Sequence, residues 1–208
     1  TASSDLDLVF IYNAPPGTEY SDGLKPLPPT QYYARLGKRL INAITALTAE
    51  GSLYEVDMRL RPSGNAGPVA TTTEAFRKYH TKDAWTWEHM ALTRARVVQA
   101  TSAEFATDVS AEIKAVLTRP REPEKLLRDV ADMRARLARE KPAECSWSLK
   151  QLRGGPVDIE FIVQYLILKN AAEHPAILAS STLEMIRNLV NADLLDSHAG
   201  ERLSAAFQ

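Results

Sequence analysis

The sequence predicts an α+β fold, in which a small mixed sheet with helices is followed by an all-helical part. An apolar run rich in β-branched and aromatic residues at 8–12 and an alternation of apolar and polar residues at 53–60 indicate the strands. Most later segments repeat their apolar residues every three or four positions, which is typical of helices packed on one face. We expect one domain at residues 1–120 and a helical domain at 121–208, because prolines at 120 and 123 interrupt the helical period.

The elements of the first part follow from local patterns. Residues 8–12 form a near-continuous apolar run, as a buried strand does. Residues 13–30 contain five of the chain's 12 prolines and predict a loop. A helix is expected from residue 30 to about 50, ending at Gly51. Apolar and polar residues alternate over 53–60, which predicts a second strand, and 62–68 reads as a loop.

The second half of the chain is dominated by helical periodicity. A short helix is expected at residues 73–80, with Thr73 as a possible cap. Further helices are expected near 83–99, 102–117, 123–139, 156–170 and 182–190, with a last one from about 199.

Composition excludes several classes of protein. The 208 residues include 25 Lys+Arg and 26 Asp+Glu, so a net charge of -1 argues against a basic nucleic-acid binder. No apolar run approaches the roughly 18 residues that a membrane-spanning helix needs. A single cysteine, Cys145, leaves no internal disulfide and agrees with a reducing, cytoplasmic location. The chain opens at Thr1 without a signal-peptide pattern, as an excised fragment would.

The first candidate site is the Asp-x-Asp pair formed by Asp5 and Asp7. Residues two apart on a strand point to the same face, so the two carboxylates project together. Paired carboxylates repel one another unless a cation lies between them, and Mg²⁺ prefers such oxygen ligands. The alternative is two solvated acids at the start of a strand.

The second candidate is the charged face of the predicted strand at 53–60, where Glu55, Asp57, Arg59 and Arg61 alternate with apolar residues. An acid beside two arginines suits a metal and phosphate site, because guanidinium groups bind phosphate oxygens in pairs of hydrogen bonds. The glycines of the following loop allow the backbone to approach a ligand, or they serve only a turn. A plain solvent-facing sheet surface is the alternative for the charges.

Together, the two strands predict three carboxylates, two metal ions and a nucleoside triphosphate in a phosphoryl- or nucleotidyl-transfer site. Neither a phosphate-binding loop of the Gly-x-x-x-x-Gly-Lys-Ser/Thr type nor a Gly-x-Gly-x-x-Gly fingerprint is present.

A Gly-Gly-Pro turn at 154–156 opens a later helix and forms a further candidate. Lys150 lies just before the turn and Glu160 lies early in the helix, where an anion or a nucleotide could be held. The helix dipole alone also explains acidic residues at this position. Arg94 or Arg96, on the helix expected at 83–99, could reach a phosphate or position an active-site acid.

Four ordered motifs together resemble the bacterial glutamine synthetase adenylyltransferases, members of the nucleotidyltransferase superfamily. They are Ser-Ser-Asp-Leu-Asp-Leu-Val-Phe at 3–10, Leu-Tyr-Glu-Val-Asp-Met-Arg-Leu-Arg-Pro-Ser-Gly-Asn-Ala-Gly-Pro at 53–68, Ala-Trp-Thr-Trp-Glu-His-Met-Ala-Leu-Thr-Arg-Ala-Arg-Val-Val at 84–98, and Gly-Gly-Pro-Val-Asp-Ile-Glu-Phe-Ile-Val-Gln-Tyr-Leu at 154–166. The family enzyme has an adenylyl-removing half and an adenylylating half, and the strings Trp-Thr-Trp-Glu-His and Val-Asp-Ile-Glu-Phe are similar to the adenylylating half.

The resemblance implies a nucleotidyltransferase-like fold and an enzyme that moves AMP from ATP to a tyrosine of glutamine synthetase. It implies that Asp5, Asp7 and Asp57 bind two Mg²⁺ ions and that Ser3 and Ser4 help to bind the nucleotide. The superfamily's glycine turn would precede residue 1. There are two alternatives: the chain is the adenylyl-removing half, or it is an incomplete fragment that only binds its protein partner. The implied partners are glutamine synthetase and a PII-type signalling protein, with neither nucleic acid nor membrane.

Overall fold

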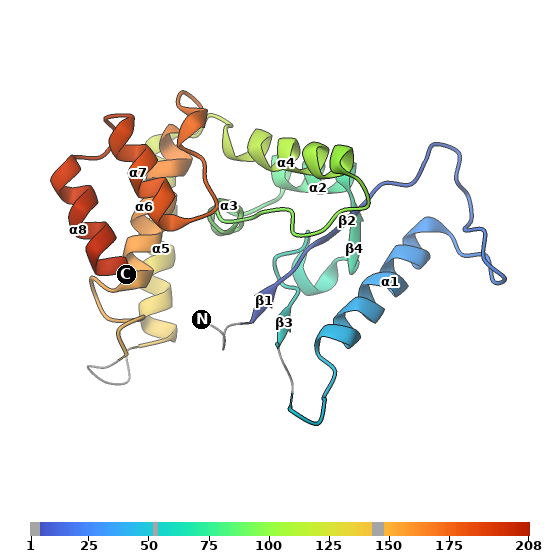
Figure 1. Cartoon of the computed structure of the whole chain (residues 1–208). Helices are drawn as coiled ribbons and strands as arrows, with labels where there is room; N and C mark the ends of the chain where they lie inside the picture. Colours follow the sequence, from blue (N-terminus) through green and yellow to red (C-terminus); the bar gives the residue numbers. More distant parts are fainter. Residues whose placement is uncertain (1–4, 52–53, 143–147) are drawn as a thin grey trace. The chain divides into compact units, whose positions relative to one another are not determined.

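A computed structural model describes residues 5–51, 54–142 and 148–208, and the chain divides into two compact units, Thr1–Ala84 and Trp85–Gln208 (Figure 1). All strands found in the described residues belong to the first unit, and the second unit is helical. The predicted α+β class is confirmed. No helix of the described residues is long and apolar enough to cross a membrane.

The first unit contains two pairs of parallel strands. β1 (Leu6–Asp7) pairs with β3 (Val56–Asp57), and β2 (Phe10–Tyr12) pairs with β4 (Ala70–Thr72). The strands expected in one small mixed sheet thus form two separate pairs, both parallel. β4 was not predicted, because its three residues are too short to show a period of two.

The second predicted strand ends much earlier than the sequence pattern indicates. β3 stops at Asp57, because the Asp57 Oδ1 atom accepts a hydrogen bond of 2.8 Å from the backbone N–H of Arg59. This contact turns the chain two residues after the aspartate. The predicted strand at 53–60 is therefore wrong beyond Asp57, and Arg59 and Arg61 do not continue its face; residue 53 lies outside the described residues.

Helix α1 (Pro29–Ile44) packs beside the strands of the first unit. The ring of Tyr33 stacks on Tyr12, with 4.2 Å between their centroids. Gly37 is buried where a side chain would press against Phe10 and Val69. The long Pro-rich loop before α1 agrees with the prediction, whereas the helix ends six residues before the expected residue 50.

Helix α2 (Thr73–Lys82) follows β4 without a loop. The hydroxyl of Thr72 accepts a hydrogen bond of 3.1 Å from the N–H of Ala75, so the cap is one residue before the predicted Thr73. Phe76 and His80 from the next two turns are both buried, with ring centroids 4.4 Å apart.

The second unit consists of six α-helices among the described residues, and the middle four begin and end within one residue of the prediction. The last, expected from about 199, begins at Ser197, whereas the first is shorter than predicted and covers Thr86–Leu92 instead of 83–99. The six are α3 (Thr86–Leu92), α4 (Ala103–Leu117), α5 (Pro123–Glu140), α6 (Pro156–Asn170), α7 (Thr182–Asn191) and α8 (Ser197–Phe207).

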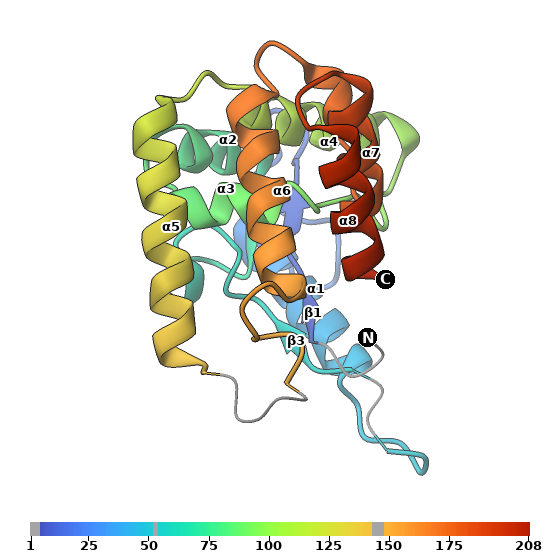
Figure 2. The same ribbon diagram turned by 90° about the vertical axis from the view of Figure 1, so that its left-hand side faces the viewer.

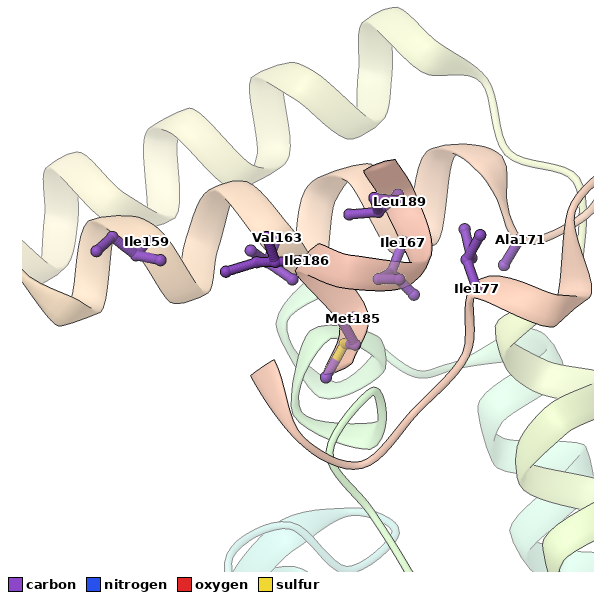
Figure 3. Close-up of a cluster of buried hydrophobic side chains, with 8 residues drawn as sticks. All are labelled: Ile159, Val163, Ile167, Ala171, Ile177, Met185, Ile186 and Leu189. Atoms are coloured by element: carbon purple, nitrogen blue, oxygen red, sulfur yellow. The ribbon is translucent and has the colours of Figure 1, made fainter. Parts of the chain in front are cut away.

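Helix α6 lies at the centre of this unit and buries apolar residues on more than one side, although Ile162 stays exposed. One side contributes to a core shared with α7 and the short 3-10 helix η2 (Pro175–Ile177), shown in Figure 3. Another side carries Leu168, which packs with Leu126 and Val130 of the antiparallel helix α5 (Figure 2).

The division between the units does not coincide with the domain boundary expected at residue 120. Met90 of α3 is buried in one cluster with Leu117 and Leu126, so residues 85–117 share the core of the later helices. The segment 118–122 is a loop between α4 and α5, as the two prolines indicate. Local composition reveals such a loop but not which helices share a core across it.

Arg121 joins two helices through its guanidinium group. Its Nη1 atom donates to the carbonyl of Leu117 and its Nη2 atom to that of Val116, at 2.9 Å each, and a longer contact of 3.4 Å joins Nη1 to the carbonyl of Leu168 in α6. Burial lowers the pKa of Arg121 to about 10, so the group stays charged at neutral pH.

Replacing Arg121 with methionine should destabilise the second unit by about 2 kcal/mol, because several carbonyl groups at the end of α4 lose their donor. Urea unfolding followed by tryptophan fluorescence measures this, since all three tryptophans follow residue 84. Arg187→Met on the exposed face of α7 is the matched control and should change the unfolding free energy by less than about 0.5 kcal/mol. Equal effects of the two changes would mean that the Arg121 contacts contribute nothing specific.

Candidate active site

The parallel pairing of β1 and β3 brings two of the predicted carboxylates together. Asp7 and Asp57 are register partners, and the pairing is fixed by the N–H groups of Leu6 and Leu8, which donate to the carbonyls of Glu55 at 2.8 Å and Asp57 at 2.9 Å. Partners on neighbouring strands project to the same face and lie about 5 Å apart at the backbone. Asp5 precedes Asp7 by two residues and, by alternation, belongs to the same face.

Arg59 binds Asp57 with both its backbone and its side chain. The Arg59 N–H donates to Asp57 Oδ1, while Nε donates to Oδ2 at 2.7 Å and Nη2 forms a further contact with Oδ2. These hydrogen bonds hold the pKa of the Asp57 carboxyl below its ordinary value. The pKa of Arg59 is raised mainly by Asp57, and also by the charges of Asp7 and Asp5. All three carboxylates therefore act on one guanidinium group.

The donor chemistry of this face suits a hard cation. Three carboxylates from two adjacent strands offer the oxygen ligands that Mg²⁺ prefers. Within residues 5–51, 54–142 and 148–208, no three His, Cys, Asp or Glu side chains lie close enough together to hold a metal ion. Arg59 gives a physical reason, because its backbone N–H binds Asp57 Oδ1 and its guanidinium group binds Oδ2, so a positive charge already lies at this carboxylate.

Arg61 has a different environment from Arg59. It is buried, and its Nη1 and Nε atoms donate to the carbonyls of Met58 at 2.7 Å and Gly67 at 3.3 Å. Arg61 thus closes the loop that follows β3, and its predicted contact with a nucleotide stays a prediction. A Cβ atom at Gly67 would lie 1.9 Å from the carbonyl oxygen of Pro62, so this glycine is required by the turn itself.

The remaining predicted site residues belong to the second unit or fall outside the described residues. Ser3 and Ser4 are outside the described residues, as is Cys145. Lys150 is exposed in a turn of the second unit. Glu160 in α6 accepts a hydrogen bond of 2.6 Å from Arg94 Nη1, the partner that the sequence suggested for an acid. Nucleotide binding by Lys150 and Glu160 stays a prediction.

The turn before α6 is held by Asp158. One carboxylate oxygen accepts the N–H of Gly154 at 2.5 Å, and the other is paired with Arg134 of α5. A Cβ atom at Gly155 would lie 2.1 Å from the carbonyl of Leu149. The two glycines therefore serve a tight turn. Sequence analysis did not identify Arg134, because partners 24 residues apart on different helices leave no local pattern.

Comparisons with known proteins agree on one family. A family model described as glutamate-ammonia ligase adenylyltransferase matches residues 1–112. The chain is 50% identical over 206 residues to a bifunctional glutamine synthetase adenylyltransferase/adenylyl-removing enzyme of Bradyrhizobium diazoefficiens, covering 99% of this chain and 21% of that protein. An identically described protein of Xanthobacter autotrophicus is 46% identical over 212 residues, which cover 100% of this chain and 21% of that protein. One from Brucella suis is 56% identical over 168 residues, which cover 81% of this chain and 17% of that protein. The chain thus spans about a fifth of the length of these relatives.

Proposed function

Since the chain belongs to the glutamate-ammonia ligase adenylyltransferase family, we propose that its first unit carries a site that transfers AMP from ATP to a tyrosine of glutamine synthetase. The observation that carries the proposal is the strand register that sets Asp7 beside Asp57, with Asp5 on the same face. Two adjacent strands carrying carboxylates are a suitable support for nucleotidyl transfer.

In this reaction the tyrosine oxygen forms a bond to the α-phosphorus of ATP, and the bond from that phosphorus to the pyrophosphate oxygen breaks. The tyrosine proton passes to water. Asp5, Asp7 and Asp57 would hold two Mg²⁺ ions, which supply charge for the attacking and leaving oxygens. Hydrogen bonds from Arg59 lower the pKa of Asp57 and so favour its ionised form. A carboxylate with a lowered pKa is better suited to bind a metal ion than to accept the tyrosine proton.

A second candidate is removal of AMP by phosphorolysis, in which a phosphate oxygen bonds to the phosphorus of the AMP group, the bond from that phosphorus to the tyrosine oxygen breaks, and ADP leaves. The descriptions of the relatives contain both activities, so this alternative has a specific basis. The same carboxylates would serve it, since both reactions exchange groups at one phosphorus atom. Which of the two activities this chain performs is decided by assay.

The test uses the purified chain with unmodified glutamine synthetase, Mg²⁺ and ATP labelled in its α-phosphate. Label on glutamine synthetase that is lost when EDTA removes the metal supports AMP transfer. A parallel sample contains AMP-labelled glutamine synthetase and inorganic phosphate, and release of labelled ADP supports the adenylyl-removing reaction. Association with glutamine synthetase without either reaction would leave only the binding role.

The same proposal places glutamine synthetase as the protein substrate, a PII-type protein as regulator and the cytoplasm as the location. Adding a PII-type protein to the transfer assay tests the regulatory part, because a regulator must change the rate of one of the two reactions. An unchanged rate in both would remove it from the proposal.

A further inference from the structure

Arg59 and Asp57 form an ion pair in which one partner is covered and the other is open to solvent. The side chain of Asp57 is 13% exposed, whereas that of Arg59 is 70% exposed. Only the carboxylate is held in place by the strand, at a position paired with Asp7. The guanidinium group can therefore leave without disturbing the packing of the unit.

The contacts also show what Arg59 does to the carboxylates. Both oxygens of Asp57 accept hydrogen bonds from Arg59, and the positive charge of Arg59 also acts on Asp7 and Asp5. A divalent cation approaching the three carboxylates meets a guanidinium charge already fixed at one of them. Because the Arg59 side chain is 70% exposed, water can solvate the guanidinium group when a stronger ligand draws it away from Asp57.

We propose that Arg59 is an exchangeable counter-ion, which lies on Asp57 while the site is empty of nucleotide and moves to the triphosphate when the nucleotide arrives with its cation. This inference rests on the proposed function and adds that Arg59 couples metal binding to nucleotide binding. Arg59 disfavours binding of a metal alone and favours binding of the metal–nucleotide complex. The side chain is suited to this exchange because a guanidinium group binds carboxylates and phosphates with the same pair of donors.

The proposal predicts effects of opposite sign for Arg59→Gln. Removing the charge should tighten binding of Mn²⁺ alone by about tenfold, because a repulsion at a distance of a few ångströms is lost. The same change should weaken binding of Mn²⁺ with a non-hydrolysable ATP analogue by about tenfold, because a phosphate contact is lost. Isothermal titration of the purified chain measures both affinities without any turnover.

Two further variants complete the experiment. Arg39→Gln removes the same charge from an exposed position on α1 and should change neither affinity by more than about twofold. Arg59→Lys keeps the charge but not the two-donor geometry, and its two affinities should fall between those of the original chain and the glutamine variant. Circular dichroism establishes that each variant is folded.

If Arg59→Gln weakens both kinds of binding, Arg59 only positions Asp57 and the exchange is wrong. Unchanged Mn²⁺ affinity also overturns it. These outcomes differ from failure of the proposed function, which would appear as absence of AMP transfer and of the adenylyl-removing reaction in the original chain.

Discussion

Replacement of Asp7 by asparagine is expected to reduce AMP transfer by about a thousandfold or more. Asparagine keeps the size of the side chain but removes one of the charges that would hold the proposed cations beside Asp57. Each such cation would contribute on the order of several kcal/mol to the stability of the transition state, and each 1.36 kcal/mol corresponds to about a tenfold change in rate. Transfer of labelled AMP to glutamine synthetase measures the loss.

The fold should survive this change, because the backbone N–H groups of Leu6 and Leu8 hold this segment to the neighbouring strand. Removing one of two neighbouring negative charges is neutral or slightly stabilising without metal. Thermal melting without Mg²⁺ should therefore be unchanged or slightly higher, while the stabilisation by Mg·ATP should disappear.

Asp22→Asn in the exposed loop before α1 is the matched control, and its transfer rate should stay within twofold of the original. Near-normal transfer by Asp7→Asn would refute the role of the paired carboxylates. Loss of transfer together with loss of the metal-free fold would instead make Asp7 a structural residue.

The helices of the second unit could be predicted closely because their signals are local. Ser102 accepts the N–H of Phe105 at the start of α4, and Pro156 follows a glycine at the start of α6. Such caps and the apolar period act within a few residues, so the sequence contains them directly. The bounds of α6 agree with the prediction to the residue.

The strands and the site are less local, and here the sequence was only partly informative. Alternation over 53–60 predicted a strand that the Asp57–Arg59 contact ends after Asp57. The pair Arg94–Glu160 joins residues 66 positions apart, and a register such as Asp7–Asp57 depends on how two strands meet. The motifs could nominate the carboxylates, but pairing between distant segments is a property of the folded chain.

A second large loss, of stability in the first unit, is expected from a substitution in the loop after β3. Gly67→Ala should destabilise the first unit by about 3 kcal/mol, because the added Cβ atom would lie 1.9 Å from the backbone oxygen of Pro62 and neither backbone segment can move freely. Gly67 also accepts a hydrogen bond from Arg61, and its own N–H donates to Gly64 at 3.1 Å. A displaced loop would loosen both contacts. Hydrogen exchange of the backbone amides in residues 54–84 measures the loss separately from the second unit.

Gly23→Ala is the matched control for this change, because nothing lies within 4 Å of the Cβ atom that it would add. Its exchange rates should match those of the original chain. Gly67→Ala should also weaken Mg·ATP binding, because the loop begins next to Asp57 and Arg59, and a shift of about 1 Å is enough to misplace a ligand. Faster exchange with unchanged Mg·ATP binding would separate the loop's stability from the site. Exchange equal to that of Gly23→Ala would show that the turn can relax around the methyl group, so that glycine at 67 is not needed for packing.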